Sequence, residues 1–243
     1  MPDDAVPGNP VPAHEVTGMF DRIAPIYDAM NTLMTLGLDA RWRRAAASAT
    51  GLGPGMHAVD VACGSGSLTR DLARMVGPTG SVDGVDLSAA MLRQAGRRHG
   101  SPTAAAPRYS VGDALALPFD DGAADATTIA FGLRNVSDHR RALAEMLRVT
   151  RPGGRVVVLE IATPSGRMGR FVSSIWFERV VPLVGRLLGG GGAYRYLPDS
   201  VRRYPSPSVI ADRMTEAGLE DVAWRRLTLG MVTLHAGRRP EQG

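Results

Sequence analysis

The sequence of 243 residues contains no lysine and only one cysteine, Cys63. A single cysteine excludes a disulfide within the chain and any metal site built from several thiolates. All 28 basic residues are arginines spread along the chain, and 24 acidic residues leave a net charge of only +4. Because there is no basic arm and no zinc-finger spacing, we expect no nucleic-acid partner. We also expect no metal site.

Long apolar runs are missing as well. No stretch approaches the ~18 residues that a membrane-spanning helix requires. The N-terminus is acidic and rich in proline, and it lacks the apolar core of a signal peptide. This composition predicts a disordered tail over residues 1–15. We therefore expect a cytoplasmic protein whose single domain covers residues 16–243.

Short apolar runs alternate with helical patterns from residue 57 onward. Such alternation predicts an α/β fold in which a mostly parallel sheet has helices on both faces. Residues 16–50 are mostly helical in pattern and are interrupted by Pro25. Residues from about 163 to 205 break the rhythm and are expected to form an inserted helical cap. The expected strands are 57–62, 81–86, 108–112, 125–131, 155–161, 221–227 and 231–236.

The stretch "DVACGSGSLT", residues 60–69, joins the first of these strands to a helix. Ligands of parallel sheets bind beyond the carboxyl ends of the strands, where Gly64 and Gly66 lie. Glycines there let the backbone approach a ligand and adopt unusual dihedral angles. Asp86 ends the second strand 20 residues after Gly66, close to the spacing at which an acid meets ribose hydroxyls. Up to this point NAD and S-adenosylmethionine fit equally well.

Two details favour S-adenosylmethionine. A dinucleotide-binding loop needs a third glycine where this chain has Thr69. A dinucleotide-binding domain also usually has a second nucleotide-binding half, and this chain uses those residues for other elements. The stretch "GDALALPF", residues 112–119, puts Asp113 at the end of the third strand, before a small residue and an apolar loop. An acid near the amino group and apolar side chains on the ring faces suit an adenine.

Several motifs carry a family resemblance. "DVACGSGSLT", "GVDLSAAML", "GDALALPF" and "RPGG" resemble the successive motifs of class I methyltransferases. "FDRIAPIYDAMNTLMTLGLDARWRR", "TIAFGLRNVSDHRRALAEMLRVTRPGGRVVVLE", "YRYLPDSVRRYP" and "MVTLHAG" closely resemble the quinone-biosynthesis C-methyltransferases, from about Val16 to Arg238. That family methylates demethylmenaquinol or a ubiquinone precursor. The resemblance implies a Rossmann-like fold with a seven-stranded sheet whose final strand is antiparallel.

The resemblance also implies which residues form the site. Arg134 and Asn135 would be catalytic, with Arg134 stabilising a developing phenolate as a fixed cation. An arginine alone is a poor base because its pKa exceeds ~12, so the family pattern implies that it assists deprotonation through water. The alternative is a structural Arg134 paired with a carboxylate such as Asp138. The expected cofactor residues are Asp60, Gly64, Gly66, Thr69, Asp86, Leu87, Asp113, Ala114 and Ala130.

Substrate contacts are expected from the N-terminal helices and the cap. The candidates are Tyr27, Tyr194, Tyr196 and Arg202, and the alternative for each is a packing role. Residues 167–188 mix apolar side chains with arginines, which fits a cap over the pocket or an amphipathic surface resting on the inner face of the membrane. The expected partner is a prenylated quinol. A homodimer is left open.

We therefore predict C-methylation of demethylmenaquinol by S-adenosylmethionine. The all-arginine, alanine-rich composition indicates a GC-rich bacterium, and such organisms generally rely on menaquinone. Three alternatives remain: a ubiquinone precursor as substrate, an aromatic natural product, or a non-catalytic scaffold for other quinone-pathway proteins. The glycine run at residues 189–192 departs from the family pattern and is the reason for considering a natural product.

Overall fold

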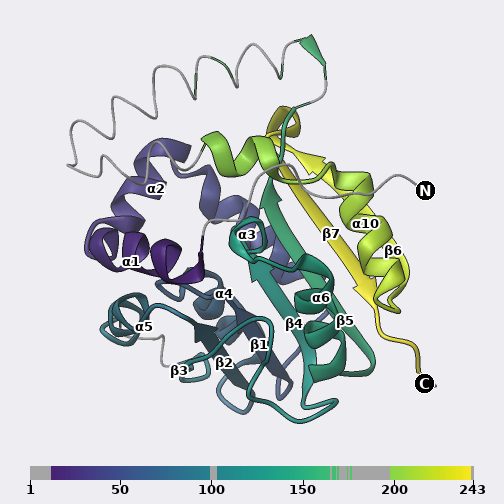
Figure 1. The fold of residues 1–243 in the computed structure, drawn as a ribbon. Coiled ribbons are helices and arrows are strands. Elements are labelled where there is room, and N and C mark those ends of the chain that lie inside the picture. Colours follow the sequence, from purple (N-terminus) through teal and green to yellow (C-terminus); the bar gives the residue numbers. More distant parts are fainter. Residues whose placement is uncertain are drawn as a thin grey trace.

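The computed structural model describes residues 12–98, 103–164 and 198–241, together with Gly166, Arg167, Gly169, Ser174 and Trp176. Its centre is a seven-stranded sheet in the order β3-β2-β1-β4-β5-β7-β6 (Figure 1). All neighbouring pairs are parallel except the two that involve β7. The strands are β1 (His57–Val61), β2 (Ser81–Asp86), β3 (Arg108–Val111), β4 (Ala124–Ala130), β5 (Thr150–Ile161), β6 (Glu220–Leu227) and β7 (Val232–Arg238).

This sheet confirms the predicted fold, including its antiparallel final strand. Only the short helix η3 (Thr228–Gly230) connects β6 to β7. A connection that short allows only antiparallel pairing, whereas parallel neighbours need a crossover of a dozen or more residues. Strand β5 begins five residues earlier than the sequence predicts, at Thr150, so its Pro-Gly-Gly turn is part of the strand.

Two of the described helices, α5 and α6, begin with a side-chain cap. The Ser88 hydroxyl accepts a hydrogen bond from the Met91 amide at 3.1 Å, and the Asp138 carboxylate accepts one from the Arg141 amide at 3.0 Å. Such caps satisfy amides that have no partner within the helix. The helices are α1 (Ala13–Ile23), α2 (Tyr27–Thr35), α3 (Leu38–Ala49), α4 (Ser67–Val76), α5 (Ala89–Gly96), η1 (Leu133–Asn135), α6 (His139–Val149) and α10 (Pro207–Glu216).

Side chains of the central strands alternate between two apolar layers. Val156 and Val158 of β5 belong to a buried cluster with α6 and α10. Val157 and Leu159 belong to a second cluster with α3 and α4 on the opposite face. This alternation follows from the two-residue period of a strand. It places helices on both faces of the sheet, as predicted (Figure 1).

The N-terminal helices form a separate layer. α1 contacts α5, and Ile23, Met30 and Met34 pack with Met91 of α5 in a third apolar cluster, which Trp176 also contacts (Figure 1). α1 begins at Ala13, inside the predicted tail; the tail's first eleven residues lie outside the described residues. Most of the predicted cap lies outside them too, although residues 198–203 are helical.

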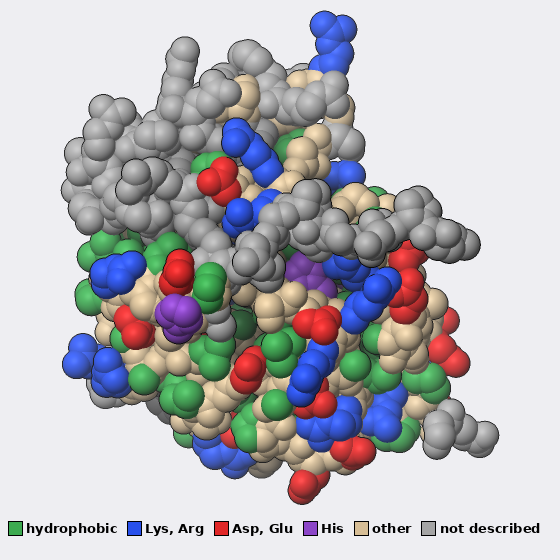
Figure 2. All heavy atoms as spheres, viewed as in Figure 1, with side chains coloured by type: hydrophobic (Ala, Val, Ile, Leu, Met, Phe, Trp, Pro, Cys, Tyr) green, Lys and Arg blue, Asp and Glu red, His purple; other side chains and the backbone are tan. Residues whose placement is uncertain are grey.

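The surface drawn in Figure 2 carries basic and acidic side chains interspersed with one another. Several arginines of the protein pair with acids, for example Arg140 with Glu216 at 2.9 Å and Arg148 with Asp121 at 2.8 Å. Pairing of this kind is typical of a solvated surface. Within the described part of the chain, no helix has both the length and the apolarity needed to cross a bilayer.

Candidate functional site

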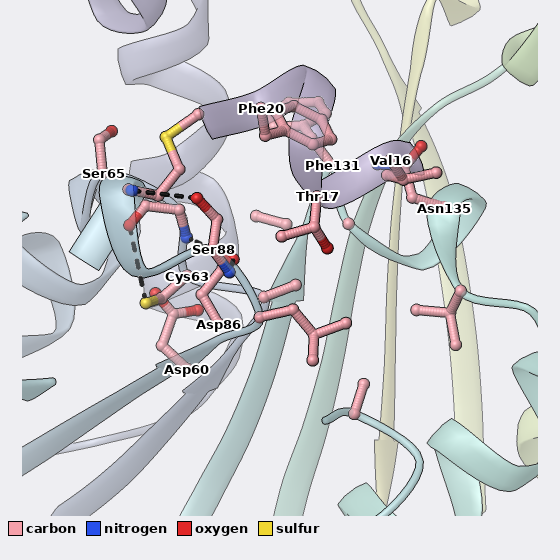
Figure 3. A pocket seen from close by; sticks show the side chains of 18 of the residues that line it. Val16, Thr17, Phe20, Asp60, Cys63, Ser65, Asp86, Ser88, Phe131 and Asn135 are labelled. Atoms are coloured by element: carbon pink, nitrogen blue, oxygen red, sulfur yellow. Dashed lines mark hydrogen bonds between the residues drawn. The ribbon is translucent and has the colours of Figure 1, made fainter. Parts of the chain in front are cut away.

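A cavity opens where the ends of β1, β2 and β4 meet α1 and α2, and we call it the loop cavity (Figure 3). Acidic side chains from the strand ends lie on one side of it, side chains of α1 lie over it, and Asn135 lies on the opposite side (Figure 3). Its wall includes nine of the predicted site residues: Tyr27, Asp60, Gly64, Asp86, Leu87, Asp113, Ala114, Ala130 and Asn135.

Gly64 and Gly66 have different structural roles in the loop. Both have positive φ, +56° at Gly64 and +73° at Gly66. A Cβ added to Gly64 would meet nothing within 4 Å, so its backbone lies open to the cavity. A Cβ added to Gly66 would overlap the hydroxyl of Tyr109. Gly66 is therefore needed for packing of the loop against β3 and does not itself line the cavity.

Asp86 organises the floor of the loop cavity. One carboxylate oxygen accepts a hydrogen bond from the Gly64 amide and the other from the Ser88 amide, both at 2.8 Å. Burial raises the pKa of this carboxyl. A carboxylate offers about four acceptor positions, so each oxygen can accept a further bond from a ribose hydroxyl.

Asp60 is held by two threonines behind the loop. Thr69 donates to one carboxylate oxygen at 2.6 Å and Thr128 to the other at 2.7 Å. Burial raises the pKa of Asp60 to about 6. Thr69 is fully buried and does not line the cavity, so it acts through Asp60 rather than on a ligand. The sequence gives no signal for Thr128, which lies on a neighbouring strand.

The far end of the loop cavity is apolar with one acid. The Asp113 carboxylate accepts from the Leu115 amide at 2.9 Å, which fixes the turn after β3. Leu87 is 41% exposed although it is a large apolar residue in the cavity wall. A flat ring lying against Leu87 and Leu115 would cover this surface, with Asp113 at its edge.

The N-terminal helices are joined to the loop cavity by two short hydrogen bonds. Ser65 donates to Asp28 of α2, and Ser88 donates to Asp21 of α1, both at 2.5 Å. The sequence predicted neither pair, because nothing local to a residue indicates a partner 37 or 67 positions away. These bonds hold α1 and α2 over the cavity.

Arg134 is a buried cation with a carboxylate partner. Its guanidinium donates to Glu160 at 2.7 Å, its backbone amide donates to the other Glu160 oxygen at 3.2 Å, and the side chains are 7% and 0% exposed. The alternative partner Asp138 instead caps α6. Sequence reasoning missed Glu160, which lies on the adjacent strand β5.

A second cavity adjoins the first, and we call it the apolar cavity. Arg134 lines it, whereas Asn135 lines the loop cavity. The two cavities share Phe20, Tyr27, Asn31, Arg43 and Phe131. The remaining wall is mostly apolar and includes Met19, Ile23, Met30, Met34, Leu36, Leu38, Trp42, Ile161, Trp176, Met231 and Val232.

The predicted substrate residues have separate outcomes. Tyr27 is at the junction of the two cavities. Tyr194 and Tyr196 lie outside the described residues. The structure does not bring Arg202 to either cavity: its side chain is 78% exposed and lies 3.7 Å from Asp199 on the same short helix, so it faces solvent. Among the residues that the structure describes, no group of three or more His, Cys, Asp or Glu side chains converges as metal ligands would.

Comparison with known proteins identifies relatives of this architecture. The model of the ubiE/COQ5 methyltransferase family matches residues 10–239. A demethylmenaquinone methyltransferase of Thermus thermophilus is 43% identical, over 91% of this chain and 100% of the relative. A ubiquinone/menaquinone biosynthesis C-methyltransferase of Geobacter sulfurreducens is 41% identical, over 92% of this chain and 88% of the relative.

Solved structures share the fold at lower identity. A methyltransferase of Thermotoga maritima that depends on S-adenosylmethionine superposes with a TM-score of 0.64 at 18% identity, covering 91% of this chain and 98% of that one. The [4+2]-cyclase SpnF superposes with a TM-score of 0.60 at 21% identity, covering 96% and 99%. A cyclase among the neighbours means that the fold alone does not define the reaction. The family model, in contrast, matches nearly the whole chain and specifies a methyltransferase. The chain belongs to the ubiE/COQ5 methyltransferase family.

Proposed function

We propose that this protein transfers a methyl group from S-adenosylmethionine to the ring carbon of demethylmenaquinol, giving menaquinol. The observation that carries the proposal is the junction of the two cavities. A cavity lined by acids and a glycine loop meets an apolar cavity that contains Arg134. The names of the Thermus and Geobacter relatives support the quinol as substrate.

The loop cavity fits S-adenosylmethionine through its donors and acceptors. Asp86 has free acceptor positions for two ribose hydroxyls, and Asp113 can accept from the adenine amino group. Leu87 and Leu115 would cover the ring faces, and the open backbone at Gly64 lets the ligand approach closely. A dinucleotide would need a second half-site at the place that the apolar cavity occupies.

The reaction needs a nucleophilic ring carbon in line with the methyl group. S-adenosylmethionine supplies a methyl made electrophilic by the sulfonium. The residues at the junction, Tyr27, Asn31 and Phe131, would hold the quinol ring beside it. Alignment of two reactants contributes on the order of 7 kcal/mol or more in favourable cases.

Arg134 would stabilise the oxygen anion of the reacting ring. Its ion pair with Glu160 keeps the guanidinium charged and fixed in orientation. A preorganised cation in a site without water stabilises developing charge without reorganisation. Because Arg134 keeps its protons, it is a stabilising group and not the proton acceptor.

The apolar cavity would hold the start of the isoprenoid tail. Methionine, leucine, isoleucine, valine, phenylalanine and tryptophan side chains form most of its wall. Each buried CH₂ group contributes about 0.8 kcal/mol, so a prenyl chain can supply most of the affinity.

The same elements support contact with a membrane surface. Leu33 and Leu36 of α2 are 46% and 78% exposed, and Leu229 in η3 is 58% exposed. Leu36 and the η3 residue Thr228 both line the apolar cavity. We infer that these leucines rest in the bilayer interface, from which the tail enters. The homodimer stays a prediction.

The experiment compares transfer of labelled methyl to three reduced acceptors: demethylmenaquinone, a ubiquinone precursor and a naphthoquinol without a tail. We expect turnover of the first and a markedly lower kcat/KM for the third. Equal rates with and without the tail would overturn the tail assignment. Turnover of the reduced ubiquinone precursor alone would assign the enzyme to ubiquinone synthesis. A chain that binds cofactor but methylates no quinol or phenol would instead be a scaffold.

A further inference from the structure

The proposed reaction requires a group that accepts the proton of the quinol hydroxyl. Four described residues in the wall of the apolar cavity are charged or titratable: Tyr27, Asp39, Arg43 and Arg134. Arginines are protonated at all ordinary pH values. Burial raises the pKa of Tyr27, which makes its anion scarce. Within the described wall, Asp39 is the one carboxylate.

Asp39 is a buried carboxylate with acceptor positions to spare. Only 5% of the residue is exposed. One oxygen accepts from the Thr35 hydroxyl at 3.0 Å, and the other accepts from the Arg43 guanidinium at 2.8 Å. Two of about four acceptor positions are thereby used. The remaining acceptor positions of the Asp39 carboxylate can receive a proton from a hydroxyl inside the apolar cavity.

Arg43 connects this carboxylate to the junction of the two cavities. It lies one helical turn after Asp39 on α3 and lines both cavities. Its Nε is buried and has no hydrogen-bond partner among the described residues. A buried donor without a partner destabilises the protein, and an oxygen atom of a ligand at the junction would satisfy it.

The other buried carboxylates near the cavities do not face the apolar cavity. Glu160 accepts from the Arg134 guanidinium, the Arg134 amide and the Ile161 amide, and it lines neither cavity. Asp60 and Asp86 line the loop cavity and are absent from the wall of the apolar cavity. Asp39 is left as the carboxylate that faces the apolar cavity.

We propose that Asp39 accepts the proton of the quinol hydroxyl and that Arg43 binds the oxygen that loses it. This inference rests on the proposed function. The O–H bond breaks, its electron pair stays on oxygen, and the proton goes to a carboxylate oxygen of Asp39. The negative charge moves from Asp39 to the quinol oxygen, so the charge beside Arg43 is unchanged.

The later steps return the proton. The ring carbon forms its bond to the methyl group while the methyl–sulfur bond breaks and leaves its electron pair on sulfur. The ring carbon then loses its hydrogen as a proton to water, and that C–H electron pair restores the aromatic ring. Asp39 gives its proton back to the ring oxygen. One proton is released in each turnover.

The first test replaces the carboxylate with an amide of the same shape, Asp39→Asn. Because general bases contribute about 10²–10⁴-fold, we expect kcat on reduced demethylmenaquinone to fall by that factor. Cofactor affinity measured by calorimetry should stay within about threefold, since Asp39 does not line the loop cavity. The control is Asp71→Asn, which breaks a similar Asp–Arg pair on α4 away from both cavities and should leave kcat unchanged.

The second test separates a base from a structural residue. Without Asp39 the quinol must ionise in solution, so kcat of Asp39→Asn should rise about tenfold per pH unit between pH 7 and 9, while wild-type kcat stays nearly flat. Formate should restore activity to Asp39→Ala by occupying the space of the lost carboxylate. Parallel pH profiles together with failed rescue would overturn the role of Asp39. A wild type that methylates no quinol would refute the proposed function, and this inference with it.

The third test concerns the oxygen that Arg43 binds. Arg43→Gln should lower kcat at least tenfold with quinol and change cofactor affinity by less than threefold. A loss confined to cofactor affinity would show that Arg43 binds the methionine carboxylate instead, and would overturn its role toward the quinol. Thermal melting of each variant distinguishes a folding defect from either result.

Discussion

The Asp86 carboxylate supports the fold through two hydrogen bonds and is the proposed acceptor for the cofactor ribose. Its two oxygens fix the Gly64 amide and the start of α5, and the remaining acceptor positions face the cavity. Replacing Asp86 with alanine removes the charged acceptor that we propose for the ribose. A hydrogen bond to a charged group contributes about 1.5–3 kcal/mol, so we expect affinity for S-adenosylmethionine to fall about 10- to 100-fold by calorimetry.

The matched control is Asp83→Asn on the same strand. Asp83 pairs with Arg108 at 2.6 Å and His57 at 2.7 Å and does not line the loop cavity. It should lower stability without changing cofactor affinity. Equal affinity losses in both variants would mean that Asp86 acts only by supporting the sheet.

Asp60 makes stability depend on pH in a defined direction. Burial raises its pKa from 3.8 to about 6 in the folded chain. The folded state therefore binds the proton more tightly than the unfolded state, and stability is lost as the pH rises from about 4 to about 6. At ~1.4 kcal/mol per pKa unit, the loss is about 3 kcal/mol.

The measurement is urea unfolding of wild type and Asp60→Asn without ligand, at pH values from 4 to 7. The wild-type free energy of unfolding should decrease relative to the variant over this range, and the difference should be constant above pH 7. The other titrating groups are present in both proteins, so their contributions cancel in the difference between the two unfolding free energies. A difference independent of pH would contradict the assigned shift.

At the scale of elements, α1 and α2 act as a cover whose position depends on a few polar contacts. Asp28 of α2 accepts from Ser65 in the glycine loop and pairs with Arg98. Asp28→Ala releases α2 from the loop. Losing a bond of about 1.5 kcal/mol should raise the dissociation rate of S-adenosylmethionine about tenfold in stopped-flow measurements.

A helix variant outside the cover provides the comparison. Asp138→Ala removes the N-cap of α6 and should cost about 1 kcal/mol of stability. Its effect on the dissociation rate should be negligible. If Asp28→Ala lowers stability but leaves the dissociation rate unchanged, the helices do not retain the cofactor.

At the scale of the whole molecule, ligand binding should be visible as added stability. A ligand at 100 times its dissociation constant stabilises the folded state by about 2.7 kcal/mol. For a chain of this length that corresponds to a rise of about 5–10 °C in melting temperature. We expect this rise with S-adenosylhomocysteine and none with NAD in differential scanning fluorimetry. A comparable rise with NAD would refute the cofactor assignment.

Local sequence patterns were enough to predict the architecture and to bring most of the predicted cofactor residues to one cavity. Strand, turn and helix follow one another within a few residues, so periodicity and caps such as Ser88 are enough to predict them. The predicted cofactor residues sit at strand ends, and the parallel order brings those ends to one edge. For this reason Gly64, Asp86 and Asp113 all line the loop cavity as expected.

How distant segments meet is visible in the folded structure alone. Glu160, not Asp138, is the partner of Arg134, because strand order puts β5 beside β4. Trp42 donates to Thr228 at 2.8 Å across 186 residues of sequence, which brings α3 to η3 at the wall of the apolar cavity. Arg202 belongs to a stretch that resembles the family motif, yet its side chain is exposed to solvent. Hydrogen bonds and cavities depend on the packing angle of whole elements, and no local pattern encodes that angle.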